Sequence, residues 1–218
     1  MIPIGDDNAY RRTFPVVTYG LIALNVVVFL VELTQPDPQG YLVTWGAVPA
    51  RITAGQDLGT LITSMFLHAG WLHLLGNMLF LFVFGDNVED AFGHVRYLLF
   101  YLACGILAGL GQVLLAPTAT LPGVGASGAI SGVLAAYLIM FGRNPVRVII
   151  GFIPAVVPAW VMIGVWIVLQ FLNGFASLGQ TAQGGGVAYG AHVGGFVGGL
   201  ALTLVLRPRG PRPLRRYR

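Results

Sequence analysis

The sequence predicts an all-α membrane protein in which six transmembrane helices form one bundle, with the N and C termini in the cytoplasm. Apolar residues make up 56% of the 218 residues and charged residues only 9%, and the mean hydropathy is +0.78. Soluble globular domains carry about 25% charged residues, so this composition excludes that class. The apolar residues fall into six runs, and the twelve basic residues, all arginine, are distributed unequally between the intervening segments.

The first half of the chain contains three of these runs. Residues 1–13 are polar, and the run at 14–33 rises about 1.5 Å per residue, so it covers the roughly 30 Å of a hydrocarbon layer. Residues 41–70 are too polar for a clean span and are expected to form short helices at the membrane interface. The second span is predicted from residue 71 to residue 84 and a little beyond, ending near Asp86, Glu89 and Asp90, and the third is predicted over residues 95–115.

The fourth run, residues 127–141, is short. Its roughly 16 residues rise about 24 Å, which is less than the thickness of the hydrocarbon layer. If Arg143 lies at the far membrane surface, Ser127 lies several ångströms below the near surface. The run therefore predicts a hydroxyl submerged in the membrane.

Two further spans complete the domain. The fifth is predicted over residues 148–171, where Pro154 and Pro158 are expected to kink the helix or delay its start. A mobile loop at 173–186 precedes the sixth span at 187–206. The expected organisation is thus a cytoplasmic N-terminal segment, a membrane domain and a cytoplasmic Arg/Pro-rich tail, at residues 1–13, 14–206 and 207–218.

The arginines predict the orientation. An even number of spans places both termini on one side of the membrane. Eleven of the twelve arginines fall on that side, and only Arg51 falls on the other. Since arginine is enriched in cytoplasmic loops, both termini are expected in the cytoplasm.

Four polar side chains are expected at one depth in the outer half of the bundle. His73 and Asn77 lie four residues apart on one face of the second helix, Ser127 opens the fourth helix after a Pro/Gly-rich loop, and His192 lies in the second turn of the sixth. Polar residues within hydrocarbon are candidates for function. Interhelical hydrogen bonding is the alternative for His73 and Asn77, and helix packing or capping is the alternative for Ser127.

Ser127 and His192 supply a nucleophile and a general base, because a hydroxyl attacks well only when an imidazole accepts its proton. No acidic residue follows Asp90, and none is expected in the outer half of a span, so the interpretation is a dyad. His73, Asn77 and the backbone N–H of Ser127 would then donate to an oxyanion.

Glycines spaced four apart predict close helix contacts: Gly128 with Gly132, Gly195 with Gly199, Gly194 with Gly198, and Gly105 with Gly109. We expect contact between the fourth and sixth helices to bring His192 to Ser127. His68 lies about 140° from His73 around a helix, so the two are not expected to share a face for a metal. No metal or other cofactor is predicted.

The chain resembles the rhomboid family of intramembrane serine proteases over nearly its whole length. The resemblance rests on three motifs: His-x-x-x-Asn at His73, Gly-x-Ser-Gly at Gly125, and Ala-His followed by spaced glycines at His192. It implies a six-helix bundle, Ser127 as nucleophile and His192 as base. It also implies that His73, Asn77 and Gly125 stabilise the oxyanion or the substrate.

The resemblance further implies cleavage of transmembrane protein substrates near their outer ends. The protein is expected in the plasma membrane, which is the inner membrane of a bacterium, with its active site open to the outside. The surrounding lipid bilayer is an expected partner, and nucleic acid is not. Two features depart from the family pattern. Ser131 replaces a tyrosine that packs on the catalytic imidazole in many members, and the Trp-Arg pair of some members is absent before His68.

Two other functions remain possible on the sequence alone. An inactive relative that binds transmembrane helices would not need both Ser127 and His192. A small-solute transporter would be expected to carry its polar residues near the midplane, in two related halves, and this chain shows neither feature.

Overall fold

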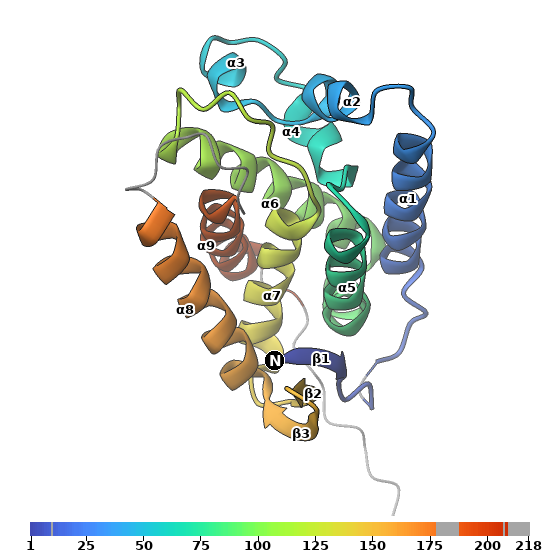
Figure 1. The fold of residues 1–218 in the computed structure, drawn as a ribbon. Coiled ribbons are helices and arrows are strands. Elements are labelled where there is room, and N and C mark those ends of the chain that lie inside the picture. Colours follow the sequence, from blue (N-terminus) through green and yellow to red (C-terminus); the bar gives the residue numbers. More distant parts are fainter. Residues whose placement is uncertain (10, 178–187, 207, 209–218) are drawn as a thin grey trace, which may run out of the picture.

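The computed structural model describes residues 1–9, 11–177, 188–206 and 208, and it is mostly helical (Figure 1). Within these residues, helices long and apolar enough to cross a membrane are α1 (Val16–Leu33), α5 (Trp71–Phe92), α6 (His94–Leu115) and α9 (Tyr189–Leu206). Helices α7 (Ser127–Phe141) and α8 (Ala159–Ser177) complete the bundle, and α7 and the stretch Ala159–Leu172 of α8 are also apolar. The predicted mobile loop at 173–186 is wrong at its start, because α8 continues to Ser177, and the rest of it lies outside the described residues, as does most of the tail at 207–218.

The helix boundaries agree closely with the hydrophobic runs in four places. The runs at 14–33, 95–115, 127–141 and 187–206 correspond to α1, α6, α7 and α9 within two residues at each end. Helix α5 runs through its acidic residues and ends at Phe92, close to the end predicted near Asp86, Glu89 and Asp90. The last turns of α5 carry acidic residues that are paired within the protein, so they do not end the helix at the first charge.

Short helices occupy the segment between α1 and α5, as the mixed composition of residues 41–70 predicts. They are α2 (Pro38–Trp45), α3 (Pro49–Thr53), α4 (Thr60–Thr63) and the 3₁₀ turn η1 (Ser64–Phe66). In Figure 1 they lie across one end of the bundle.

A three-stranded antiparallel sheet lies at the opposite end (Figure 1) and was not predicted. Its strands are β1 (Ile2–Gly5), β2 (Pro145–Ile150) and β3 (Ile153–Pro158), in the order β1-β2-β3. The predicted span at 148–171 is therefore wrong in nearly its first half, residues 148–158, whereas the expected delay of the helix start by Pro154 and Pro158 is confirmed. Proline lacks a backbone N–H and does not fit a helix interior, so Pro154 and Pro158 keep this stretch extended, and helix α8 begins at Ala159.

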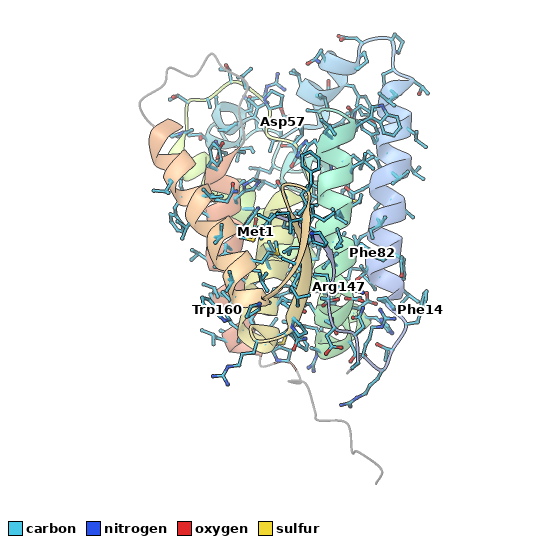
Figure 2. The ribbon with its side chains drawn as sticks, turned by 60° about the horizontal axis from the view of Figure 1, so that its bottom comes forward. Met1, Phe14, Asp57, Phe82, Arg147 and Trp160 are labelled. Atoms are coloured by element: carbon cyan, nitrogen blue, oxygen red, sulfur yellow. The ribbon has the colours of Figure 1, made fainter. Side chains whose placement is uncertain are left out.

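Arg147 and Arg51 lie at opposite ends of the bundle. Arg147 of β2 is at the end that carries the sheet, which is turned forward in Figure 2, and Asp57 is at the far end. Arg51 pairs with Asp57 at 3.5 Å, so it also lies at the far end. This is the one arginine that the sequence assigns to the side opposite the termini.

Acidic residues near the end of α5 fix the N-terminal segment. The carboxylate of Glu89 accepts hydrogen bonds from the backbone N–H groups of Val17 and Thr18, at 2.9 and 2.7 Å, in the first turn of α1. Asp86 pairs with Arg11 at 2.6 Å. These bonds explain why a charged helix end is buried, because each buried carboxylate has a hydrogen-bond partner.

Helix α7 lies in the middle of the bundle and packs against α5, α6, α8 and α9 (Figure 1). Its residues from Val133 to Tyr137 are completely buried. A Cβ built on Gly195 would lie 2.0 Å from the carbonyl oxygen of Gly128, and one on Gly199 would lie 2.4 Å from Cα of Gly132. The predicted glycine contact between these two helices is confirmed.

The predicted pairs Gly194–Gly198 and Gly105–Gly109 differ in what lies against them. Gly194 lies against the α6 backbone at Gly111, as a helix-packing glycine should. Gly105 and Gly109 do not fit the expectation, because the atoms nearest to a Cβ built on them belong to the side chains of Met65 and Leu61.

Candidate active site

Ser127 is the first residue of α7, at the end of a loop in which Gly125 has a φ of +121°. The first intrahelical hydrogen bond runs from the N–H of Ile130 to the carbonyl of Ala126, so the N–H groups of Ser127 and Gly128 have no partner within the helix. Such free N–H groups favour negative charge at a helix N-terminus. The half-buried Ser127 hydroxyl lies directly beside them.

His192 lies in the first turn and a half of α9, and its side chain is buried. Its Nε2 is 2.7 Å from Oγ of Ser127, which is hydrogen-bonding distance. The structure therefore brings together the two residues that the sequence paired, from helices 65 positions apart in the chain.

The other ring nitrogen of His192, Nδ1, is 2.7 Å from Oε1 of Gln170 in α8. Gln170 was not among the predicted site residues, although a glutamine inside an apolar span is a signal for function. Aromatic rings also flank the imidazole: its centroid is 5.7 Å from that of Trp166 and 6.4 Å from that of Tyr189. Ser131 does not contribute, because its hydroxyl donates to the carbonyl of Ser127, 2.6 Å away.

His73 and Asn77 come together around Gly125. A Cβ built on Gly125 would lie 2.7 Å from both Cε1 and Nε2 of His73, and 3.5 Å from Nδ2 of Asn77. The N–H of Gly125 itself donates to the carbonyl of Ser64, at 2.9 Å. All the predicted site residues therefore lie in one region, at the N-terminal ends of α5, α7 and α9.

His68 also belongs to this cluster. It is completely buried, its Nε2 is 3.0 Å from Nδ2 of Asn77, and its ring centroid is 5.1 Å from that of His73. The expectation that His68 and His73 point apart is wrong, because His68 precedes the start of α5 at Trp71 and helical spacing does not apply to it. Burial, and after it the nearby His73, lowers the pKa of His68 to about 4.

An acidic residue lies beside this cluster, contrary to expectation. Glu32, in the last turn of α1, is buried and accepts a hydrogen bond from the backbone N–H of His68 at 3.2 Å. It contacts His68 and not His192, whose Nδ1 is bound to Gln170. Among the residues that the structure describes, no three His, Cys, Asp or Glu side chains are grouped as a metal site.

A cavity of about 50 Å³ adjoins Ser127. Its polar lining includes Ser64 and Gln112, and Oε1 of Gln112 is buried without a hydrogen-bond partner among the described residues. The lining is mostly apolar, but a cavity of this size that offers Ser64, Gln112 and Ser127 as polar partners can hold more than one water molecule. Ser127 thus has space for water beside it.

The comparison with known proteins identifies the family. A family model described as Rhomboid domain matches residues 55–209, which is more than half of the chain. The chain belongs to the rhomboid family. The resemblance seen in the sequence is thereby confirmed, and the apolar helices make this rhomboid an integral membrane protein.

Rhomboid relatives come from bacteria and plants. Rhomboid protease GluP of Bacillus subtilis (strain 168) is 33% identical over 201 residues, which cover 90% of this chain and 36% of GluP. RHOMBOID-like protein 5 of Arabidopsis thaliana is 31% identical over 166 residues, 75% of this chain and 50% of its own. Rhomboid protease AarA of Providencia stuartii is 32% identical over 139 residues, which cover 56% of this chain and 50% of AarA. The chain spans about a third to a half of these relatives.

Proposed function

We propose that this rhomboid is an intramembrane serine endopeptidase that hydrolyses peptide bonds in or near the transmembrane segments of other membrane proteins. The observation that carries the proposal is the 2.7 Å distance between Nε2 of His192 and Oγ of Ser127. Relatives named rhomboid proteases support the same activity.

The dyad accounts for both halves of the reaction. Oγ of Ser127 attacks the carbonyl carbon of the substrate while Nε2 of His192 accepts the hydroxyl proton. The tetrahedral intermediate collapses, the C–N bond breaks, and the leaving amine takes that proton from His192. Water, activated by the same nitrogen, then hydrolyses the ester on Ser127 and frees the acid.

The oxyanion of each intermediate needs hydrogen-bond donors. The N–H of Ser127 at the start of α7, Nδ2 of Asn77 and the ring of His73 are the candidates. One N–H of Asn77 points to His68, which leaves the other for the oxyanion. Gly125 contributes by lacking a Cβ, since a side chain there would collide with His73.

The six-helix arrangement follows if α7 and α8 also cross the membrane. The arginines of residues 1–13, of the α5–α6 turn and of the β2 region would then face the cytoplasm, with both termini. Under this orientation the N-terminal end of α7 lies toward the outside, below the surface, and Ser127 is open to external water. The domain is residues 14–206, and the membrane is a bacterial inner membrane.

Transmembrane proteins are the proposed substrates and partners, in contact with the surrounding lipid. The chemistry needs no cofactor, because the nucleophile, the base and the oxyanion donors are side chains and backbone groups of the chain itself.

The test uses purified protein in liposomes with a panel of single-span substrates. Ser127→Ala and His192→Ala are expected to abolish cleavage, whereas Ser131→Ala, which removes a second hydroxyl from the same helix, is expected to keep it. A fluorophosphonate probe should label the wild type and Ser131→Ala at Ser127. Full proteolysis by Ser127→Ala would contradict the proposal, and a wild type that is not labelled would favour a helix-binding relative without catalysis.

A further inference from the structure

The catalytic imidazole has a hydrogen-bond partner that the family motifs do not include. Nδ1 of His192 and Oε1 of Gln170 are 2.7 Å apart. Gln170 lies one helical turn after Trp166 on α8, so both side chains reach the same ring. The contact is partly buried within an apolar bundle, where an unpaired N–H would be costly.

The proton positions on His192 decide whether it can act as a base. A neutral imidazole has one protonated and one unprotonated nitrogen. To accept the proton of Ser127, Nε2 must carry the lone pair, so Nδ1 must carry the hydrogen. The carbonyl oxygen of an amide is only an acceptor, and it stabilises this tautomer.

We propose that Gln170 is the positioning residue of the Ser127–His192 dyad, fixing both the tautomer and the orientation of the imidazole through Nδ1. This inference rests on the proposed function. Gln170 takes the place of an acidic third member, but it adds no negative charge and cannot accept the proton. Its contribution is therefore orientation, the part that a carboxylate plays in a triad before any charge forms.

The arrangement also makes the Ser127–His192 dyad depend on three helices. Ser127 belongs to α7, His192 to α9, and the ring of His192 is bounded by Trp166 and Gln170 of α8. Helix α8 lies at the margin of the bundle (Figure 1). The packing of α8 against α9 therefore places Gln170 and Trp166 beside the ring of His192.

The kinetic test compares three variants in liposomes. Gln170→Met keeps the size of the side chain but offers only a weak acceptor, and it is expected to lower kcat by about 10- to 100-fold with KM unchanged, the range of one lost buried hydrogen bond. Gln170→Glu keeps an acceptor oxygen at the same reach and is expected to restore most of kcat. Leu169→Met, on the exposed face of the same turn, is the matched control and should behave as wild type.

The second measurement does not depend on proteolysis. The ¹⁵N spectrum of histidine-labelled protein reports which ring nitrogen carries the hydrogen, and the His192 signals are assigned by their loss in His192→Ala. Wild type should show hydrogen on Nδ1, and Gln170→Met a mixture of both tautomers. If the tautomer is unchanged in Gln170→Met, or if the wild type cleaves its substrate and Gln170→Met has the same kcat, the inference is overturned. If the tautomer shifts but no protein cleaves any substrate, Gln170 does position His192 and the proposed function fails instead.

Discussion

Gly199 of α9 lies directly on the backbone of Gly132 in α7: a Cβ added to Gly199 would be 2.4 Å from Cα and 2.6 Å from the carbonyl oxygen of Gly132. About two turns earlier in α9, Nε2 of His192 lies within hydrogen-bonding distance of Oγ of Ser127. The close approach of these two helices therefore sets the distance within the dyad.

A methyl group at this contact should separate the helices. Gly199→Ala is expected to destabilise the protein by about 1–3 kcal/mol, the usual cost of overpacking, because backbone cannot move aside as a flexible side chain can. Activity should fall with it, since His192 moves with α9. Gly164→Ala in α8 is the control, because a Cβ there meets nothing within 4 Å. Thermal unfolding in detergent measures both, and equal midpoints would contradict the prediction.

Gly125→Ala should lower activity and also destabilise the protein, by about 1–3 kcal/mol for the strained backbone alone. The φ of +121° is unfavourable for alanine, and the new Cβ would collide with the ring of His73. Loss of an oxyanion donor lowers kcat by about 100-fold or more, and displacement of His73 is expected to have an effect of that size. Gly123→Ala, two residues earlier, would bring a Cβ no closer than 3.5 Å to the carbonyl of Ala47 and should keep most of the activity.

Asn77→Ala tests the proposed oxyanion donor directly. The variant is expected to lower kcat by about 100-fold or more with a small change in KM, because the amide acts on the transition state. It should also slow fluorophosphonate labelling of Ser127. Gly76→Ala, next to it in α5 in open space, should have wild-type kinetics; an Asn77→Ala enzyme with unchanged kcat would show that the amide only packs.

The protonation of His68 should make the fold sensitive to acid. Its pKa is about 4 in the folded protein and about 6.5 when unfolded, so the unfolded state binds more protons between these values. Stability is therefore expected to fall as the pH drops from about 6.5 toward 4. Protonation also removes the lone pair on Nε2 that accepts from Asn77.

The matching variant is His68→Gln, which keeps an acceptor for Asn77 but does not titrate in this range. Its thermal midpoint should change less than that of the wild type between pH 7.5 and pH 5. Parallel curves for the two proteins would show that His68 does not account for the pH dependence.

Several features could be predicted from the sequence because they depend on neighbouring residues. Hydrophobic runs place α1, α6, α7 and α9, and the breaker residues before Ser127 and the glycines after His192 mark the candidate site. Helix spacing also predicts the contact of Gly128 and Gly132 with Gly195 and Gly199. These signals are local, because burial of apolar surface and the helical repeat act over a few residues.

The tertiary structure alone decided the rest. The carboxylates of α5 bind the start of α1 more than 70 positions away, and β1 pairs with β2 across most of the chain. His68, which precedes the start of α5, lies within hydrogen-bonding distance of Asn77. Gln170 contacts His192 from a separate helix. A hydrogen bond between distant residues depends on where the whole bundle places both partners, and no periodicity or composition near either residue encodes that position.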